Sequence, residues 1–123
     1  MAAAVMGYKA AVHAGFEAAA LQDLRTVAAV EAQYFHSHNR TFGTLDQLRD
    51  DHSLSRKFSG EPVVADGYVF RLSIARKSDG SSFYKLTADP QHETNMHHFY
   101  LDSTDERIHV SADRQAAPAD PLQ

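Results

Sequence analysis

One acidic residue falls in the middle of an otherwise apolar helix face and is the first candidate for chemistry. Glu31 shares this face with Leu24, Val27 and Ala28. A carboxyl group buried there could act as a general acid or base with a raised pKa, but no second acid or nucleophile lies nearby in the sequence. Burial requires hydrogen-bond partners, which an arginine or the backbone N–H groups after the helix can supply. We therefore predict that Glu31 attaches the helix to the loop at Thr41–Thr44.

Several of the eight histidines are candidate metal ligands. His92, Glu93, His97 and His98 could approach one another around a loop, although His97 and His98 point to opposite faces if they lie on a strand. A metal site needs three or four convergent ligands with supporting hydrogen bonds. The sequence does not establish such a convergent, supported set, and we predict no metal and no other cofactor.

A second group of possible ligands lies near a turn. Asp102, Asp105 and Glu106 could bind calcium, but their spacing does not match an EF-hand loop. The alternative is a solvated turn in which Ser103 and Asp105 form hydrogen bonds with their own backbone.

Motifs of the common enzyme classes do not occur in the chain. The sequence contains no GxSxG, phosphate-binding P-loop, Rossmann glycine pattern or HExxH. No nucleophile, base and orienting group can be assembled from it. We therefore predict no catalytic residues, no cofactor-binding residues and no enzyme activity.

The composition of the chain argues against several classes of binding partner. The chain has 123 residues, a net charge of −4 and no cysteine. The negative charge argues against a nucleic-acid or anionic-membrane partner, and the lack of cysteine excludes disulfides and thiolate chemistry. No apolar run reaches about 18 residues, the length that spans a bilayer, and the first six residues do not resemble a signal peptide. We expect the chain as given to be soluble.

Residues 8–38 are predicted to form one long helix without proline. Its C-terminal half has a one-sided apolar face, whereas the N-terminal half is rich in alanine and buries little area. About 31 residues at 1.5 Å each give roughly 46 Å, more than the width of a compact domain of this size. The helix should therefore protrude. The apolar face comprises Phe16, Ala20, Leu21, Leu24, Val27, Ala28, Tyr34 and Phe35, and it excludes Gln22, Asp23, Arg25, Thr26, Gln33 and His36.

A second, shorter helix is predicted at about residues 44–50. Thr44 is followed three residues later by Gln47, which matches a capping box. The polar loop after it, residues 51–60, contains Leu54 and Phe58 as expected anchors in the core.

Four strands are predicted beyond the loop, at residues 67–75, 83–88, 97–102 and 107–111, from two-residue alternation and an Asp-Gly turn. The fold class is α+β: one domain over 1–123, with a long helix packed on a four-stranded antiparallel sheet. Residues 39–66 form the connecting loop, and 112–123 form an irregular, mobile tail. The helix is expected to contribute Leu21, Leu24, Val27, Ala28, Tyr34 and Phe35 to the core, and the sheet Tyr68, Phe70, Leu72, Ile74, Tyr84, Leu86, Ala88, Phe99, Leu101, Ile108 and Val110.

The ordered series of these segments resembles the type IV pilin and pseudopilin family. Residues 18–34, with small residues leading into Leu-Arg-Thr and then Glu and Tyr, are similar to the lower half of a pilin's long helix. The likeness covers about residues 15–121 and is closest to short, cysteine-free subunits of Gram-negative bacteria. It continues through Phe42–Leu48, Phe58–Gly60, Gly67–Phe70, Tyr84–Pro90, Phe99–Ser103 and Ile108–His109.

The resemblance implies a structural subunit of a pilus-like filament in the cell envelope or outside the cell. Its partners would be other pilin-like subunits, contacted through the helix up to about Phe16. The family's hydrophobic N-terminal segment, which holds it in the membrane, does not occur in the sequence as given, and neither does the C-terminal disulfide loop of many pilins. Two alternatives remain open: a pseudopilin of a type II secretion system, and a soluble module that binds a ligand or metal through its histidine-rich loop.

Overall fold

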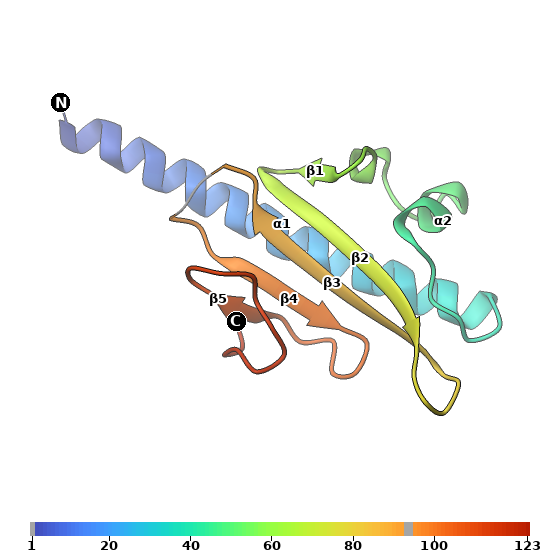
Figure 1. The fold of residues 1–123 in the computed structure, drawn as a ribbon. Helices are drawn as coiled ribbons and strands as arrows, with labels where there is room; N and C mark the ends of the chain where they lie inside the picture. The colour runs from blue at the N-terminus through green and yellow to red at the C-terminus, as the bar shows by residue number, and fades with distance from the viewer. Residues whose placement is uncertain (1, 93–94) are drawn as a thin grey trace.

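The computed structural model describes residues 2–92 and 95–123, with side chains described from Ala11 onward. A long helix crosses one face of an antiparallel sheet, and its N-terminal part extends beyond the sheet (Figure 1). The fold is therefore α+β, as predicted. The elements in chain order are α1 (Ala2–Ser37), α2 (Leu45–Asp50), the 3₁₀ turn η1 (Arg56–Phe58), β1 (Val63–Ala65), β2 (Tyr68–Arg76), β3 (Ser82–Pro90), β4 (His98–Asp102) and β5 (His109–Ser111).

The helix α1 is continuous, as predicted, and begins six residues before the expected start at 8. The alanine-rich N-terminal part favours helix intrinsically, which explains the longer extent. At the other end, Asn39 and Arg40 both have φ of 58°. The N–H of Arg40 donates to the carbonyl of Phe35 at 2.9 Å and closes the last turn.

The sheet has five strands in the order β1-β2-β3-β4-β5, so the prediction of four strands was wrong. The missed strand, β1, lies in the segment predicted as loop and pairs Val63 with Phe70 and Ala65 with Tyr68. Three residues are too few to show alternation, and the turn that follows, Asp66-Gly67, was not interpreted as a hairpin. Both turn residues have positive φ, 53° and 78°, which suits a tight two-residue connection.

Most of the predicted core is confirmed. Leu24, Val27 and Tyr68 are fully buried between α1 and the sheet. Phe35 differs, because it is half-buried against Phe42, with ring centroids 4.6 Å apart, and does not join the core cluster. Six other predicted residues are partly buried and pack against the cluster, namely Leu21, Ala28, Tyr34, Leu72, Ile74 and Val110. Phe16, at the start of the apolar face, is 38% exposed. The observed cluster also includes residues that the sequence analysis did not assign to it, namely Val30, Leu48, Val63, Ala65 and Met96.

The predicted capping box and loop anchors are confirmed. The hydroxyl of Thr44 accepts a hydrogen bond from the N–H of Gln47 at 3.2 Å, and the Gln47 side chain accepts one from the N–H of Thr44 at 2.9 Å. Leu54 and Phe58 are buried, which holds the segment after α2 against the core.

The C-terminal tail is irregular, as predicted, with one isolated bridge between Leu122 and His109, but it folds back on β5. The N–H of Val110 donates to the carbonyl of Pro121 at 2.8 Å, and the N–H of Gln123 donates to the carbonyl of Ile108 at 2.8 Å. Tyr100 on β4 and Ala116 in the tail are buried together on the sheet face opposite α1. The tail is thus a partial second layer over the outer face of the sheet.

We predict that Gly67→Ala lowers the free energy of unfolding by about 1 kcal/mol, because φ is positive there and a side chain pays for that conformation. A Cβ atom at this position would also lie 3.1 Å from Cγ of Phe16. Gly80→Ala is the matched control, since its φ is 86° and its Cβ would meet open space. Urea unfolding of both variants separates the two effects. Unchanged stability of Gly67→Ala would contradict the prediction.

Candidate functional site

The described side chains in the N-terminal part of α1 are poorly covered by the rest of the protein. Of the described side chains, none from Ala11 to Ala19 is buried, and Ala20 is the first that is fully buried. Phe16 lies against Gly67 at the β1–β2 turn, and Glu17 contacts Nδ1 of His97 at 2.7 Å. Five of the nine residues from 11 to 19 are alanine or glycine, namely Ala11, Ala14, Gly15, Ala18 and Ala19.

Glu31 attaches α1 to the connecting loop, as predicted. Its Oε1 atom accepts a hydrogen bond from the N–H of Gly43 at 2.8 Å, and the side chain is fully buried. Burial raises the pKa of Glu31 to about 7, and the Gly43 hydrogen bond opposes this rise. Oε2 has no hydrogen-bond partner among the described residues. The position of this carboxyl group is therefore explained by attachment of the loop.

A second buried carboxylate on α1 was missed. Asp23, assigned to the solvent-facing side, is only 4% exposed, and its Oδ1 lies 2.6 Å from Nζ of Lys57. Lys57 also binds Asp66, at 3.0 Å. Burial, with the Asp66 carboxyl group close by, raises the pKa of Asp23 to about 6. The helical periodicity of apolar residues did not predict this cluster. Asp23 lies on a polar side of α1, and η1 and the β1–β2 turn cover that side in the structure.

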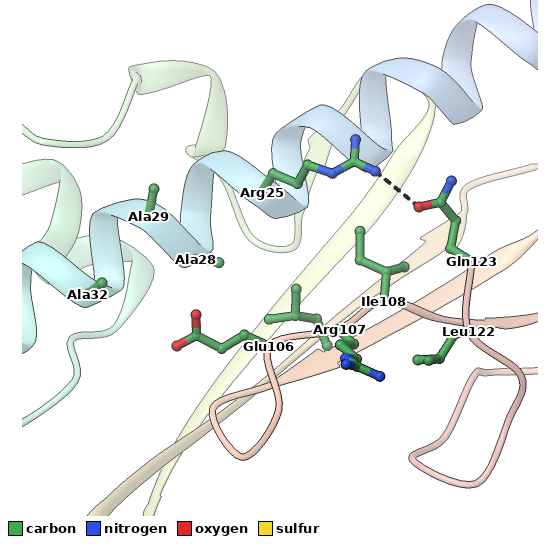
Figure 2. Close-up of a pocket in the computed structure, with 10 residues that line it drawn as sticks. Arg25, Ala28, Ala29, Ala32, Glu106, Arg107, Ile108, Leu122 and Gln123 are labelled. Carbon is green, nitrogen blue, oxygen red and sulfur yellow. Dashed lines mark hydrogen bonds between the residues drawn. The ribbon is translucent and has the colours of Figure 1, made fainter.

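A groove runs between α1 and the C-terminal edge of the sheet. Figure 2 shows Ala28, Ala29 and Ala32 along its helix side, with Ile108 and Leu122 across from them. The cavity volume is about 470 Å³. Arg25 crosses one end and donates to Oε1 of Gln123 at 3.0 Å, and Leu122 is 49% exposed. Glu106 and Arg107 also line the groove (Figure 2).

The candidate metal ligands are distributed over separate contacts. His97 pairs with Glu17 of α1, whereas His98 lies 2.7 Å from Asp89 on the outer face of the sheet. The expected opposite orientation of the two histidines is thus observed. His92 is exposed and Glu93 lies outside the described residues. Within residues 2–92 and 95–123, no three metal-ligating side chains converge.

The acidic turn follows the predicted alternative at Asp105, whereas the Ser103 hydroxyl accepts the N–H of Tyr84 on β3 at 3.2 Å and not one from its own turn. Oδ1 of Asp102 accepts the N–H of Thr104 at 2.9 Å, and Oδ1 of Asp105 accepts the N–H of Arg107 at 3.1 Å. The second oxygen of Asp105 contacts Nε2 of His109 at 3.2 Å. These contacts lower the pKa of Asp105, chiefly through the backbone N–H of Arg107. The turn is therefore held by its own carboxylates.

Comparison with known proteins found no matching family model, no matching curated protein and no matching solved structure. The class that the coordinates define is an α+β protein with one long, partly uncovered helix and a five-stranded antiparallel sheet. No helix within the described residues has the length and apolar composition needed to cross a lipid bilayer.

Proposed function

We propose that this chain is a structural, non-catalytic subunit of a type IV pilus-like filament in the cell envelope, and that it assembles through α1. The main support is the division of α1 into two parts. Its C-terminal half is covered by the sheet, and the described N-terminal side chains from Ala11 to Ala19 are half-buried or exposed. The order of segments that resembles pilins adds to this argument.

The physical reason lies in the stability of an uncovered helix. A helix that protrudes into water is marginal unless another surface covers it. The exposed part of α1 carries Ala11, Ala14, Gly15 and Ala18, which have small side chains. Small residues allow helices to approach closely and gain van der Waals contact along their length. Neighbouring subunits that pack helix against helix would supply the missing cover, and the sheet would then face outward.

The proposal predicts that photo-cross-linking through α1 traps neighbouring copies. A benzophenone amino acid placed at Ala14 or Ala18, both exposed, should give a ladder of cross-linked multimers in the cells that produce the protein. The matched control is Ala75, an exposed alanine near the end of β2, which should give mostly monomer.

The outcomes of this experiment are distinct. A ladder in the sheared extracellular fraction would identify a surface filament, and a ladder confined to the envelope would identify a short pseudopilin-like assembly. Monomer alone at both helix positions, with the protein folded and present, would overturn the proposal. Equal cross-linking at Ala75 would also argue against assembly through α1.

A further inference from the structure

A cavity on the outer face of the sheet has the features of a ligand site. Its volume is about 490 Å³, within the range of small-molecule sites. Its polar lining comes from alternate positions of β2 and β3, namely Arg71, Ser73, Lys85 and Thr87, and the tail residues 115–118 close one side. The cavity lies on the sheet face opposite α1, because Leu72 and Leu86, the alternate residues of these strands, pack in the core. It is therefore separate from the surface proposed for assembly.

A buried hydroxyl group without a partner lines this cavity. Thr87 is only 7% exposed, and its Oγ1 atom has no hydrogen-bond partner among the described residues. Leaving a buried hydroxyl unpaired costs free energy. Because Oγ1 is enclosed, rotation of the Thr87 side chain about its Cα–Cβ bond would bring the hydroxyl to the cavity, where a ligand oxygen would supply the missing partner.

The charged groups of the lining are both positive. Thr87 lies directly across from Arg71 on β2, and Lys85 is two residues along the same strand face. None of the described residues that line the cavity is acidic, and no described carboxylate forms an ion pair with Lys85. Arg71 contacts Asp89 at 3.5 Å through one nitrogen, which leaves other guanidinium donors available. This combination of two cations and two hydroxyl groups suits an oxyanion.

The remaining wall is mainly apolar, with Tyr100, Ala116, Ala117 and Pro118, and it also includes Gln115, whose amide donates to Asp89 at 3.4 Å. Tyr100 is 6% exposed and directs its hydroxyl to Asp102 at 2.8 Å, while Ala116 is 4% exposed. The tail is fixed by Asp120, which binds Arg114 through both oxygens, at 2.7 and 2.9 Å, and accepts the N–H of Ala117 at 2.8 Å. The tail residues that line the cavity are thus held in place over the sheet.

We propose that this cavity binds a small molecule that carries an oxyanion, a phosphate monoester or a carboxylate, attached to an apolar group. The oxyanion accepts hydrogen bonds from Lys85, Arg71 and the Thr87 hydroxyl. The apolar part packs against the ring of Tyr100 and residues 116–118. The net charge of −4 supplies no general attraction for anions, so affinity and selectivity arise from these local groups.

The test is an NMR titration of the isolated chain, which does not depend on filament assembly. The probes are phenyl phosphate, benzoate and benzyl alcohol, which share a ring and differ in the head group. Saturable amide shifts in β3 and at 115–117 are expected with one or both anions, and the anion that binds more tightly identifies the head group. Thr87→Val and Lys85→Gln should each weaken binding by about tenfold.

Two controls make the result decisive. Lys77→Gln removes the same charge at the turn of the β2–β3 hairpin, outside the cavity lining, where Lys77 lies over the ring of Phe83, and should leave affinity unchanged. Thr87→Val should not lose thermal stability, since it removes an unpaired hydroxyl at nearly constant volume. The proposal is overturned if neither anion gives saturable shifts, if benzyl alcohol binds equally well, or if Lys77→Gln weakens binding as much as Lys85→Gln.

Discussion

Glu31→Ala is expected to lower the free energy of unfolding by about 3 kcal/mol at pH 5, with a fall of about 10 °C in the melting temperature. The variant leaves the N–H of Gly43 buried without an acceptor and opens a cavity where the side chain was fully enclosed. Urea unfolding at fixed pH measures the loss. Full stability of the variant at pH 5 would show that Glu31 does not hold the loop to α1.

The cost of this substitution should depend on pH in a definite direction. The pKa of Glu31 rises from 4.5 to about 7 on folding, so the stability it provides is complete below pH 4.5 and is lost as pH rises to 7. Between pH 5 and pH 8 the loss amounts to about 2 kcal/mol. Glu31→Ala should therefore cost only about 1 kcal/mol at pH 8.

Glu31→Gln provides the matched control. The amide oxygen can still accept the Gly43 N–H but does not ionise, so this variant should cost little at pH 5. At pH 8 it should be more stable than the natural chain, because the natural chain then holds a buried negative charge. If the free energy of unfolding of Glu31→Gln depends on pH in the same way as that of the natural chain, a group other than Glu31 causes the pH dependence.

Lys57→Met is expected to lower the free energy of unfolding by about 2 kcal/mol at pH 8, after allowance for the exposure of the lysine. The substitution leaves Asp23 buried next to Asp66 without the cation that lies 2.6 and 3.0 Å from their oxygens. At pH 5 the cost should fall below half of this value. The pKa of Asp23, already raised to about 6 by burial, rises further without the lysine, so the carboxyl group is protonated there.

Two further variants, a double variant and a substitution of the neighbouring Arg56, test whether the loss of stability arises from the Asp23–Lys57–Asp66 cluster. Lys57→Met with Asp66→Asn removes the facing charge and should regain part of the stability at pH 8. Arg56→Met removes a cation from the same turn and should change stability little, because Arg56 is exposed and has no described partner. Equal losses for Arg56→Met and Lys57→Met would indicate a general charge effect.

The burial of one of these two carboxylates could be predicted from the sequence, and the burial of the other could not. Both lie on α1, eight residues apart, and both attach the connecting segment to the helix. Glu31 was identified because it interrupts an apolar stripe, so that burial and a partner were required. Asp23 lies beside that stripe among polar residues, and its burial depends on η1 and the β1–β2 turn. No local pattern on the helix predicts that cover.

The sheet shows the same limit. Alternation over nine residues predicted β2, and an Asp-Gly turn predicted the β2–β3 hairpin. The three residues of β1 carry too short a pattern. The position of the tail was not predicted for another reason. Its attachment depends on backbone hydrogen bonds at Val110 and Gln123, and backbone groups are the same whatever the side chains are, so the sequence carries no signal for them.

From the sequence alone it follows that α1 is one unbroken helix with a core-facing C-terminal half, that Thr44 and Gln47 cap α2, and that a sheet of alternating strands covers part of the helix. Helical period, caps and alternation arise from residues close together along the chain, so sequence spacing expresses them directly. Only the tertiary structure placed Lys57 between Asp23 and Asp66 and laid residues 115–118 over the outer face of the sheet. Most of those contacts join segments far apart along the chain, and their geometry exists only after packing has brought the segments together.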